Sequence, residues 1–146
     1  MGPGAPLRLR AESADDLEVI AACLQDAIVA AHDLRFLPGE RRFAMIANRF
    51  RWEGVPARET ERLQERVLCG VVFDTVEGAQ SRGVARAGEA PFLELLSIAA
   101  EPHAGGQAIT LTFAGGGAVR LQATRIQARL EDLTEPWPTL WRPTHV

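Results

Sequence analysis

Arginine is the residue type in this chain that most clearly offers chemistry. All 16 basic residues are arginine, and the chain contains neither lysine nor tyrosine. A lysine Schiff base, a lysine general base, the lysine of a nucleotide-binding loop and tyrosine acid–base chemistry are therefore excluded. The guanidinium groups that remain are permanently charged and can form two parallel hydrogen bonds with a carboxylate or a phosphate.

Several of these arginines fall close together in the sequence and could bind a small anion. Arg49 and Arg51 share one face of a predicted strand, and Trp52 adjoins them, so an aromatic ring could lie beside two guanidinium groups. The candidate ligand-binding residues are Arg41, Arg42, Asn48, Arg49, Arg51, Trp52 and Arg82. In a plainer interpretation, the same arginines pair with glutamates and cover apolar surface.

The other reactive residue types are scattered along the chain. His32, His103, His145, Cys23 and Cys69 form no CxxC, HExxH or comparable pair, so we expect no metal site and no cofactor. No GxSxG or SxxK sequence marks a nucleophilic serine, and we predict no catalytic residue. These observations favour a protein that is not an enzyme.

Three consecutive glycines, Gly115–Gly117, raise the question of a phosphate-binding loop. Apolar and polar residues alternate on both sides of them, over residues 109–113 and 119–122. The same period of two on both sides predicts a strand, a glycine turn and a second strand. A phosphate-binding loop instead requires a following helix and the pattern GxxxxGK[ST], and the chain has no lysine. We predict a hairpin, whose glycines could still let a ligand approach the backbone.

The first half of the chain predicts a strand, a helix and a hairpin. Residues 7–11 alternate like a short strand, and Ser13 is a suitable N-cap for a helix over residues 14–26. Pro38 and Gly39 fit the centre of a type II turn between strands near 29–37 and 41–52. Residues 53–66 are polar and form a surface connection, with Arg66 on a solvated helix face.

The strand over residues 41–52 has apolar side chains on both faces. Its even positions Ala44, Ile46, Phe50 and Trp52 predict one apolar face. On the other face, Phe43 and Met45 give way to Arg49 and Arg51. We therefore expect that second face to be covered at one end and exposed to solvent at the other.

The second half of the chain continues with strands. Strands are predicted over residues 66–78 and 91–102, with a turn over 103–107. The apolar phase slips by one residue near Thr124 and Arg125, which predicts a bend or bulge there. Residues 125–133 fit a strand or a short helix, and we favour the strand.

These elements predict an α+β fold in one domain over residues 1–146. One N-terminal helix packs on a twisted, mostly antiparallel sheet of about six to eight strands, which could close part-way into a barrel. A ferredoxin-like start is the main alternative topology. Residues 1–6 are a loose terminus, and residues 134–146 are an extended tail whose Trp137 and Trp141 we expect to dock on the domain or on a partner.

Composition narrows the partners and the compartment. A net charge of −3 argues against nucleic-acid binding, which usually requires a basic excess. No apolar run approaches the roughly 20 residues of a membrane span, so we expect no membrane association. The N-terminus lacks the features of a signal peptide, and two cysteines make a disulfide framework unexpected. The sequence favours a cytoplasmic protein.

Three stretches of the sequence resemble a known family. They are LQDAIVAAHDLRFLPGERRFAMIANRFRWE, LTFAGGGAVRLQATRIQARLEDL and the terminal RPTH. Together they resemble small bacterial proteins grouped as a domain of unknown function, from about Leu7 to His145. The resemblance implies no activity, ligand or catalytic residue. It places a shared site, if there is one, among Gln25–Asp26, Pro38, Glu40–Phe43, Asn48–Phe50 and Trp52–Glu53.

Two functions from different classes are compatible with these features. The first is a non-enzymatic domain that binds a partner protein or a second copy of itself, because a strand-rich chain has edges to protect and its tail is rich in tryptophan and proline. The alternative is a binder of a small anionic metabolite, or less readily an enzyme acting on one, through the arginine and tryptophan cluster.

Overall fold

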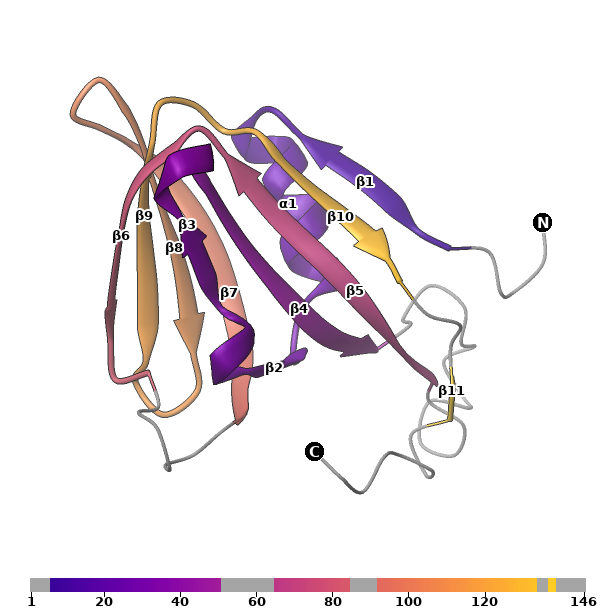
Figure 1. Ribbon diagram of the computed structural model, residues 1–146. Coiled ribbons are helices and arrows are strands. Elements are labelled where there is room, and N and C mark those ends of the chain that lie inside the picture. Colours follow the sequence, from indigo (N-terminus) through magenta and orange to yellow (C-terminus); the bar gives the residue numbers. More distant parts are fainter. Residues whose placement is uncertain (1–5, 51–64, 85–91, 134–136, 139–146) are drawn as a thin grey trace.

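The structure is a computed structural model that describes residues 6–50, 65–84, 92–133 and 137–138. Figure 1 shows one helix lying against a strongly bent sheet. Within the described residues every strand pair is antiparallel, and the strands number eleven rather than six to eight. The expected helix and mostly antiparallel sheet are confirmed. The fold is mostly β, and over the same residues the sheet does not close into a barrel.

Helix α1 (Ala14–Cys23) begins where the sequence predicts. The Ser13 hydroxyl accepts a hydrogen bond from the Asp16 amide at 3.1 Å, and Asp15 and Asp16 lie in the positively polarised first turn. The helix is shorter than predicted, because Asp26 has a φ of 65° and its amide donates to the Leu95 carbonyl at 2.9 Å. Leu17 and Ile20 are buried, and they direct the helix against β1 (Arg8–Ala11) and β7 (Phe92–His103).

The strands follow one path through the sheet. Its order is β1, β10 (Ala128–Asp132), β5 (Glu65–Asp74), β4 (Arg42–Phe50), β2 (Ile28–Ala30), β7, β8 (Gly106–Phe113), β9 (Ala118–Ala123) and β6 (Val76–Arg82). Two short strands lie off this path: β3 (Arg35–Leu37) pairs with β4, and β11 (Trp137–Pro138) pairs with β5. The prediction of a strand for residues 125–133 is confirmed by β10.

The sheet bends at a corner where three segments meet. The chain passes from β5 to β6 through Thr75, whose φ of 60° is unusual for a β-branched residue. The Thr75 carbonyl accepts from the Thr124 amide at 3.0 Å, and the Val76 amide donates to the Arg41 carbonyl at 2.9 Å. The predicted bend near Thr124 and Arg125 is confirmed, and its partner across the corner is Thr75.

In β4 the odd-numbered face, rather than the apolar even-numbered face, is turned to the core, and its expected cover at Phe43 and Met45 is confirmed. Phe43 and Met45 are buried, whereas Ile46 is 41% exposed. Apolar residues occupy both faces of β4, so alternation alone does not identify the inner one. The pairing of β4 with β5 identifies the inner face, because Val71 and Phe73 are fully buried and pair with Met45 and Phe43. The other end of the odd-numbered face was expected to be exposed to solvent, but it is also buried at Arg49.

The turn before β4 also differs from the prediction. The expected strand over residues 29–37 is divided into β2, a 3₁₀ turn η1 (Ala31–Asp33) and β3. Pro38 opens a second 3₁₀ turn, η2 (Pro38–Glu40), and Arg41 rather than Gly39 adopts the left-handed conformation, with a φ of 52°. The Arg41 amide donates to the Pro38 carbonyl at 3.1 Å, which closes the turn.

The glycine-rich segment is a hairpin, as predicted. Strands β8 and β9 pair from Gln107 opposite Ala123 to Thr112 opposite Ala118. Gly115 and Gly116 have φ angles of 87° and 97°, which side-chain-bearing residues rarely adopt. Residues 118–133, which the structure describes after the glycines, contain no helix, so no helix terminus lies next to the glycines to bind a phosphate. The predicted strand over 91–102 and the turn after it are confirmed by β7 and its tight connection to β8.

Among the described residues no helix is long and apolar enough to cross a membrane. Near the C-terminus, β11 places Trp137 opposite Arg66 of β5. Trp141, the other tryptophan expected to dock, lies outside the described residues.

Candidate functional site

The structure distributes the candidate arginines over different parts of the sheet. Arg41 and Arg42 lie at the start of β4, Arg49 lies near its end, and Arg82 ends β6 in the other half of the sheet. Arg51 and Trp52 lie outside the described residues. The side chains of Arg42 and Arg49 emerge on opposite faces of β4, so the described members of the cluster do not converge on one pocket.

Arg49 is buried in the core and paired with Asp132. Its Nε donates to Asp132 Oδ1 at 3.0 Å, and its Nη2 donates to Oδ2 at 2.8 Å. Asp132 Oδ2 also accepts a hydrogen bond from the Leu7 amide at 2.8 Å, and Arg49 Nη1 donates to the Phe50 carbonyl at 3.0 Å. These hydrogen bonds offset the cost of removing the two charged groups from water. The pair connects β4 and β10 to the segment before β1, which is a structural use of the guanidinium.

The thiol of Cys69 lies in the electrostatic environment of this ion pair. The pKa of Cys69 is raised from its ordinary 9.0 to about 12, chiefly by burial; Arg49 opposes the rise and Asp132 contributes to it. A thiol with such a pKa is protonated at neutral pH and is a poor nucleophile. Cys69 is therefore a small core residue rather than a reactive group.

Asn48 is hydrogen-bonded to a second arginine, Arg66, which was predicted to lie on a solvated helix. Arg66 donates from Nε to Asn48 Oδ1 at 2.7 Å and from Nη2 to the Asn48 carbonyl at 2.6 Å. Its guanidinium carbon lies 3.9 Å from the centre of the Phe50 ring. The prediction of a solvated helix face for Arg66 is wrong, because Arg66 belongs to β5 and is nearly buried against its partner strand.

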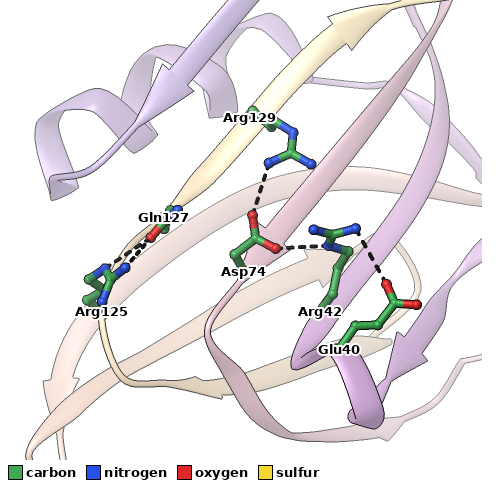
Figure 2. A network of polar contacts seen from close by, with 6 residues as sticks. All are labelled: Glu40, Arg42, Asp74, Arg125, Gln127 and Arg129. Atoms are coloured by element: carbon green, nitrogen blue, oxygen red, sulfur yellow. Dashed lines mark hydrogen bonds and ion pairs between the residues drawn. The ribbon is translucent and has the colours of Figure 1, made fainter.

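Arg42 takes part in an ionic network on the outer face of the sheet, shown in Figure 2. Arg42 Nε donates to Asp74 Oδ1 at 2.9 Å, and Arg129 Nη1 donates to the other oxygen at 3.0 Å. Glu40 adds a contact of 3.5 Å with Arg42. The hydrogen bond to Asp74 raises the pKa of Arg42, which stabilises the charged form of its guanidinium. Here the plainer interpretation of the arginines holds.

Arg82 and Arg120 are different, because no ion pair involves either of them within the described residues. Both line a cavity of about 630 Å³ over β6, β9 and β8, together with Gln80, Ser81, Thr110 and Ala118. Arg120 lies opposite Gln80 on one side and Thr110 on the other, while Arg82 lies opposite Ala118. Arg82 and Arg120 are thus diagonal neighbours on one face, roughly 7–8 Å apart at their backbones.

A second cavity of about 360 Å³ extends this site along β9. It shares Gln80 and Arg120 with the first cavity and is lined further by Gly78, Ala79, His103 and Gln122. We call the two cavities together the β9 groove. None of its described lining residues is acidic. The groove is therefore locally basic on a chain whose net charge is −3.

The sequence singled out one of the two groove arginines. Arg82 was a candidate, but Arg120 appeared only as the polar residue between Val119 and Leu121. That alternation is enough to direct Arg120 outward, since Val119 and Leu121 are buried. The signal that was missing is the pairing of β9 with β6, which brings Arg120 beside Arg82.

The family model described as "Protein of unknown function (DUF2948)" matches residues 7–145. The chain belongs to the DUF2948 family. The resemblance seen in the sequence is confirmed over nearly the same range. Comparisons of this DUF2948 chain with curated proteins and with solved structures found no match.

The sequence stretches that carry the DUF2948 resemblance have structural uses in this chain. Arg42 binds Asp74, Asn48 binds Arg66, and Arg49 binds Asp132. Pro38 and Arg41 shape the turn before β4. In this DUF2948 chain these residues hold strands together, so a ligand site is better sought in the β9 groove.

Proposed function

We propose that this chain is a small non-enzymatic binding domain that holds an anion in the β9 groove. The observation that carries the proposal is the contrast among its arginines. Arg42 and Arg49 are each bonded to a carboxylate, whereas Arg82 and Arg120 line one cavity with no ion pair in the described part of the chain. Their guanidinium groups are donors that an external phosphate or carboxylate would satisfy.

The electrostatics of the groove support this proposal. Positive groups over a surface hollow, on a chain of net charge −3, focus their field on that hollow. Because both arginines are exposed, water and salt weaken each contact. We therefore expect a dissociation constant on the order of 0.1 mM for a simple anion, equivalent to about −5.5 kcal/mol. The proposal involves binding alone and assigns no chemical step.

Isothermal titration calorimetry with inorganic phosphate tests the proposal. We expect Arg120→Gln and Arg82→Gln each to weaken binding at least about tenfold, a loss of about 1.4 kcal/mol. Arg35→Gln is the matched control, since it removes an exposed arginine on β3, outside the groove. The proposal fails if phosphate at about 10 mM gives no binding heat, or if the groove variants bind as tightly as Arg35→Gln.

Self-association is a second candidate function, favoured by a different surface. Ile46 and Leu133 are 41% and 55% exposed on the outer face of the first half of the sheet. Gly70 lies opposite Ile46, and a Cβ atom at Gly70 would lie 3.6 Å from the Leu133 side chain. These apolar groups could pack against a second copy of the chain. Sedimentation velocity of the native protein and of Ile46→Lys tests this; a native protein that stays monomeric at about 100 µM removes the candidate.

A further inference from the structure

The β9 groove is longer than a simple anion requires. Arg82, Arg120 and Gln122 lie in three successive rows of one sheet face, and His103 closes the far end. With two residues between rows, three rows span about 14 Å. A phosphate held between Arg82 and Arg120 occupies one end. The rest of the groove, on the Gln122 side, is left for the remainder of a larger ligand.

The side chains of that remainder suit hydroxyl groups. Gln80 and Gln122 each carry a donor and an acceptor, as a hydroxyl group does, and Thr110, directly opposite Arg120, adds a hydroxyl. Gln122 Nε2 donates to the His103 carbonyl at 3.2 Å, which orients its amide. Within the described residues, no donor is bonded to Gln122 Oε1, so this oxygen can accept from a ligand.

The lining also argues against other classes of ligand. Apart from the His103 imidazole at the far end, no aromatic ring and no large apolar side chain stands among the described lining residues, so a nucleobase would find no aromatic ring beside the two arginines and an acyl chain would find nothing to contact. The floor contains Gly78, Ala79 and Ala118, which leave room for a flat ring or an extended chain of polar groups. The permanent charges of the groove are confined to Arg82 and Arg120, which suits a single anionic group.

Two diagonal guanidinium groups favour phosphate over carboxylate. One arginine satisfies both oxygens of a carboxylate, whereas a phosphate monoester has three terminal oxygens and can accept from two arginines together. We infer that the natural ligand is a phosphorylated sugar or polyol, with its phosphate between Arg82 and Arg120 and its hydroxyl groups on Gln80 and Gln122. This inference rests on the proposed function of the groove.

Calorimetric titrations with glucose 6-phosphate, inorganic phosphate, glucose and gluconate test the inference. We expect glucose 6-phosphate to bind at least about tenfold more tightly than phosphate, gluconate or glucose. Gln80→Ala and Gln122→Ala should each reduce that advantage severalfold and leave the affinity for inorganic phosphate unchanged. Gln127→Ala is the matched control, since Gln127 bonds Arg125 outside the groove. Thermal unfolding of each variant establishes that it is folded.

The outcomes separate this inference from the proposal on which it rests. If phosphate binds through Arg82 and Arg120 but glucose 6-phosphate binds no more tightly, the inference is overturned and the proposed function stands. If gluconate matches or exceeds glucose 6-phosphate, the assignment of phosphate is wrong. If no anion binds, the inference and the proposed function are both wrong. Loss of the sugar phosphate's advantage in Gln80→Ala, with Gln127→Ala unaffected, supports the placement of the hydroxyl groups.

Discussion

Arg49 and Asp132 form a bidentate ion pair whose side chains are only 0% and 3% exposed. The two residues are far apart in the sequence, and the pair joins β4 to β10 across β5. Removing two charges from water is costly, and this geometry offsets the cost because both carboxylate oxygens and three of the guanidinium's possible donors are bonded. Arg49, which the sequence suggested as a ligand-binding residue, is thus part of the core.

Removing Arg49 should destabilise the fold strongly. In Arg49→Met, the Asp132 carboxylate stays buried without its counter-ion, and we expect a loss of about 3–5 kcal/mol in the free energy of unfolding. Arg49→Met/Asp132→Asn should lose less than Arg49→Met alone, because the amide oxygen can still accept from Leu7 and no charge is buried. Urea denaturation measures both. A loss under about 1 kcal/mol in the single variant would show that the pair is not buried as described.

Alkaline pH should destabilise the protein through Cys69. The thiol pKa is about 12 in the folded chain and near 9.0 in the unfolded chain. Between these values only the unfolded state releases the proton, so the free energy of unfolding should fall by about 1.4 kcal/mol per pH unit as the pH rises. Lysine and tyrosine are absent, so few other groups titrate in this window.

The Cys69→Ala variant isolates this effect. Cys23 is present in both proteins, so the difference between their pH slopes reports mainly on Cys69. Urea denaturation at several pH values from 9 to 11 should give a shallower slope for Cys69→Ala. Identical slopes in the two proteins would mean that the Cys69 thiol is not held protonated by the fold.

A glycine at the start of β8 should tolerate no side chain. A Cβ atom at Gly106 would collide with the Ala123 carbonyl oxygen, which belongs to the neighbouring strand and cannot move alone. We expect Gly106→Ala to lower the free energy of unfolding by more than about 2 kcal/mol. Gly39→Ala is the control, since a Cβ there meets no atom within 4 Å, and its effect should stay within about 0.5 kcal/mol. Equal thermal shifts in the two variants would contradict the predicted close approach at Gly106.

Replacing Arg41 by glycine should stabilise the fold. Arg41 has a φ of 52°, which is unfavourable for a residue with a Cβ atom, and its exposed side chain makes no ion pair in the described part of the chain. We expect Arg41→Gly to raise the free energy of unfolding by about 0.5–1 kcal/mol, with phosphate binding unchanged. Arg35→Gly, in β3, should instead be destabilising. A loss of phosphate binding in Arg41→Gly would return Arg41 to the list of binding residues and weaken the case for the groove.

Local pattern was enough to predict some elements and not others. The alternation around Gly115–Gly117 predicts the β8–β9 hairpin, and Ser13 predicts the start of α1, because each depends on neighbouring residues. The inner face of β4 could not be predicted, since Phe43 and Ile46 are equally apolar and only pairing with β5 distinguishes them. Arg66 was misplaced for a similar reason: its charged surroundings in the sequence resemble a solvated helix.

The candidate site depends even more on pairing between distant segments. Arg82 was predicted as a binding residue, but its neighbour Arg120 is supplied by a strand that follows it by more than thirty positions in the sequence. The burial of Arg49 likewise depends on Asp132, which lies 83 positions away. Arg49, Arg51 and Arg82 were therefore included in one candidate site from the sequence, whereas the fold separates Arg49 from Arg82 and joins Arg82 to Arg120.

Titration of the protein with inorganic phosphate, followed through the arginine Nε–Hε correlations in nitrogen–proton NMR spectra, shows whether Arg82 and Arg120 bind phosphate together. Arg82→Gln and Arg120→Gln assign the two groove signals. We expect these two signals to shift together with one dissociation constant, while those of Arg42 and Arg49 stay in place because Asp74 and Asp132 already bind them. Groove signals that remain still at about 10 mM phosphate, or shifts concentrated at Arg42 or Arg49, would contradict this expectation.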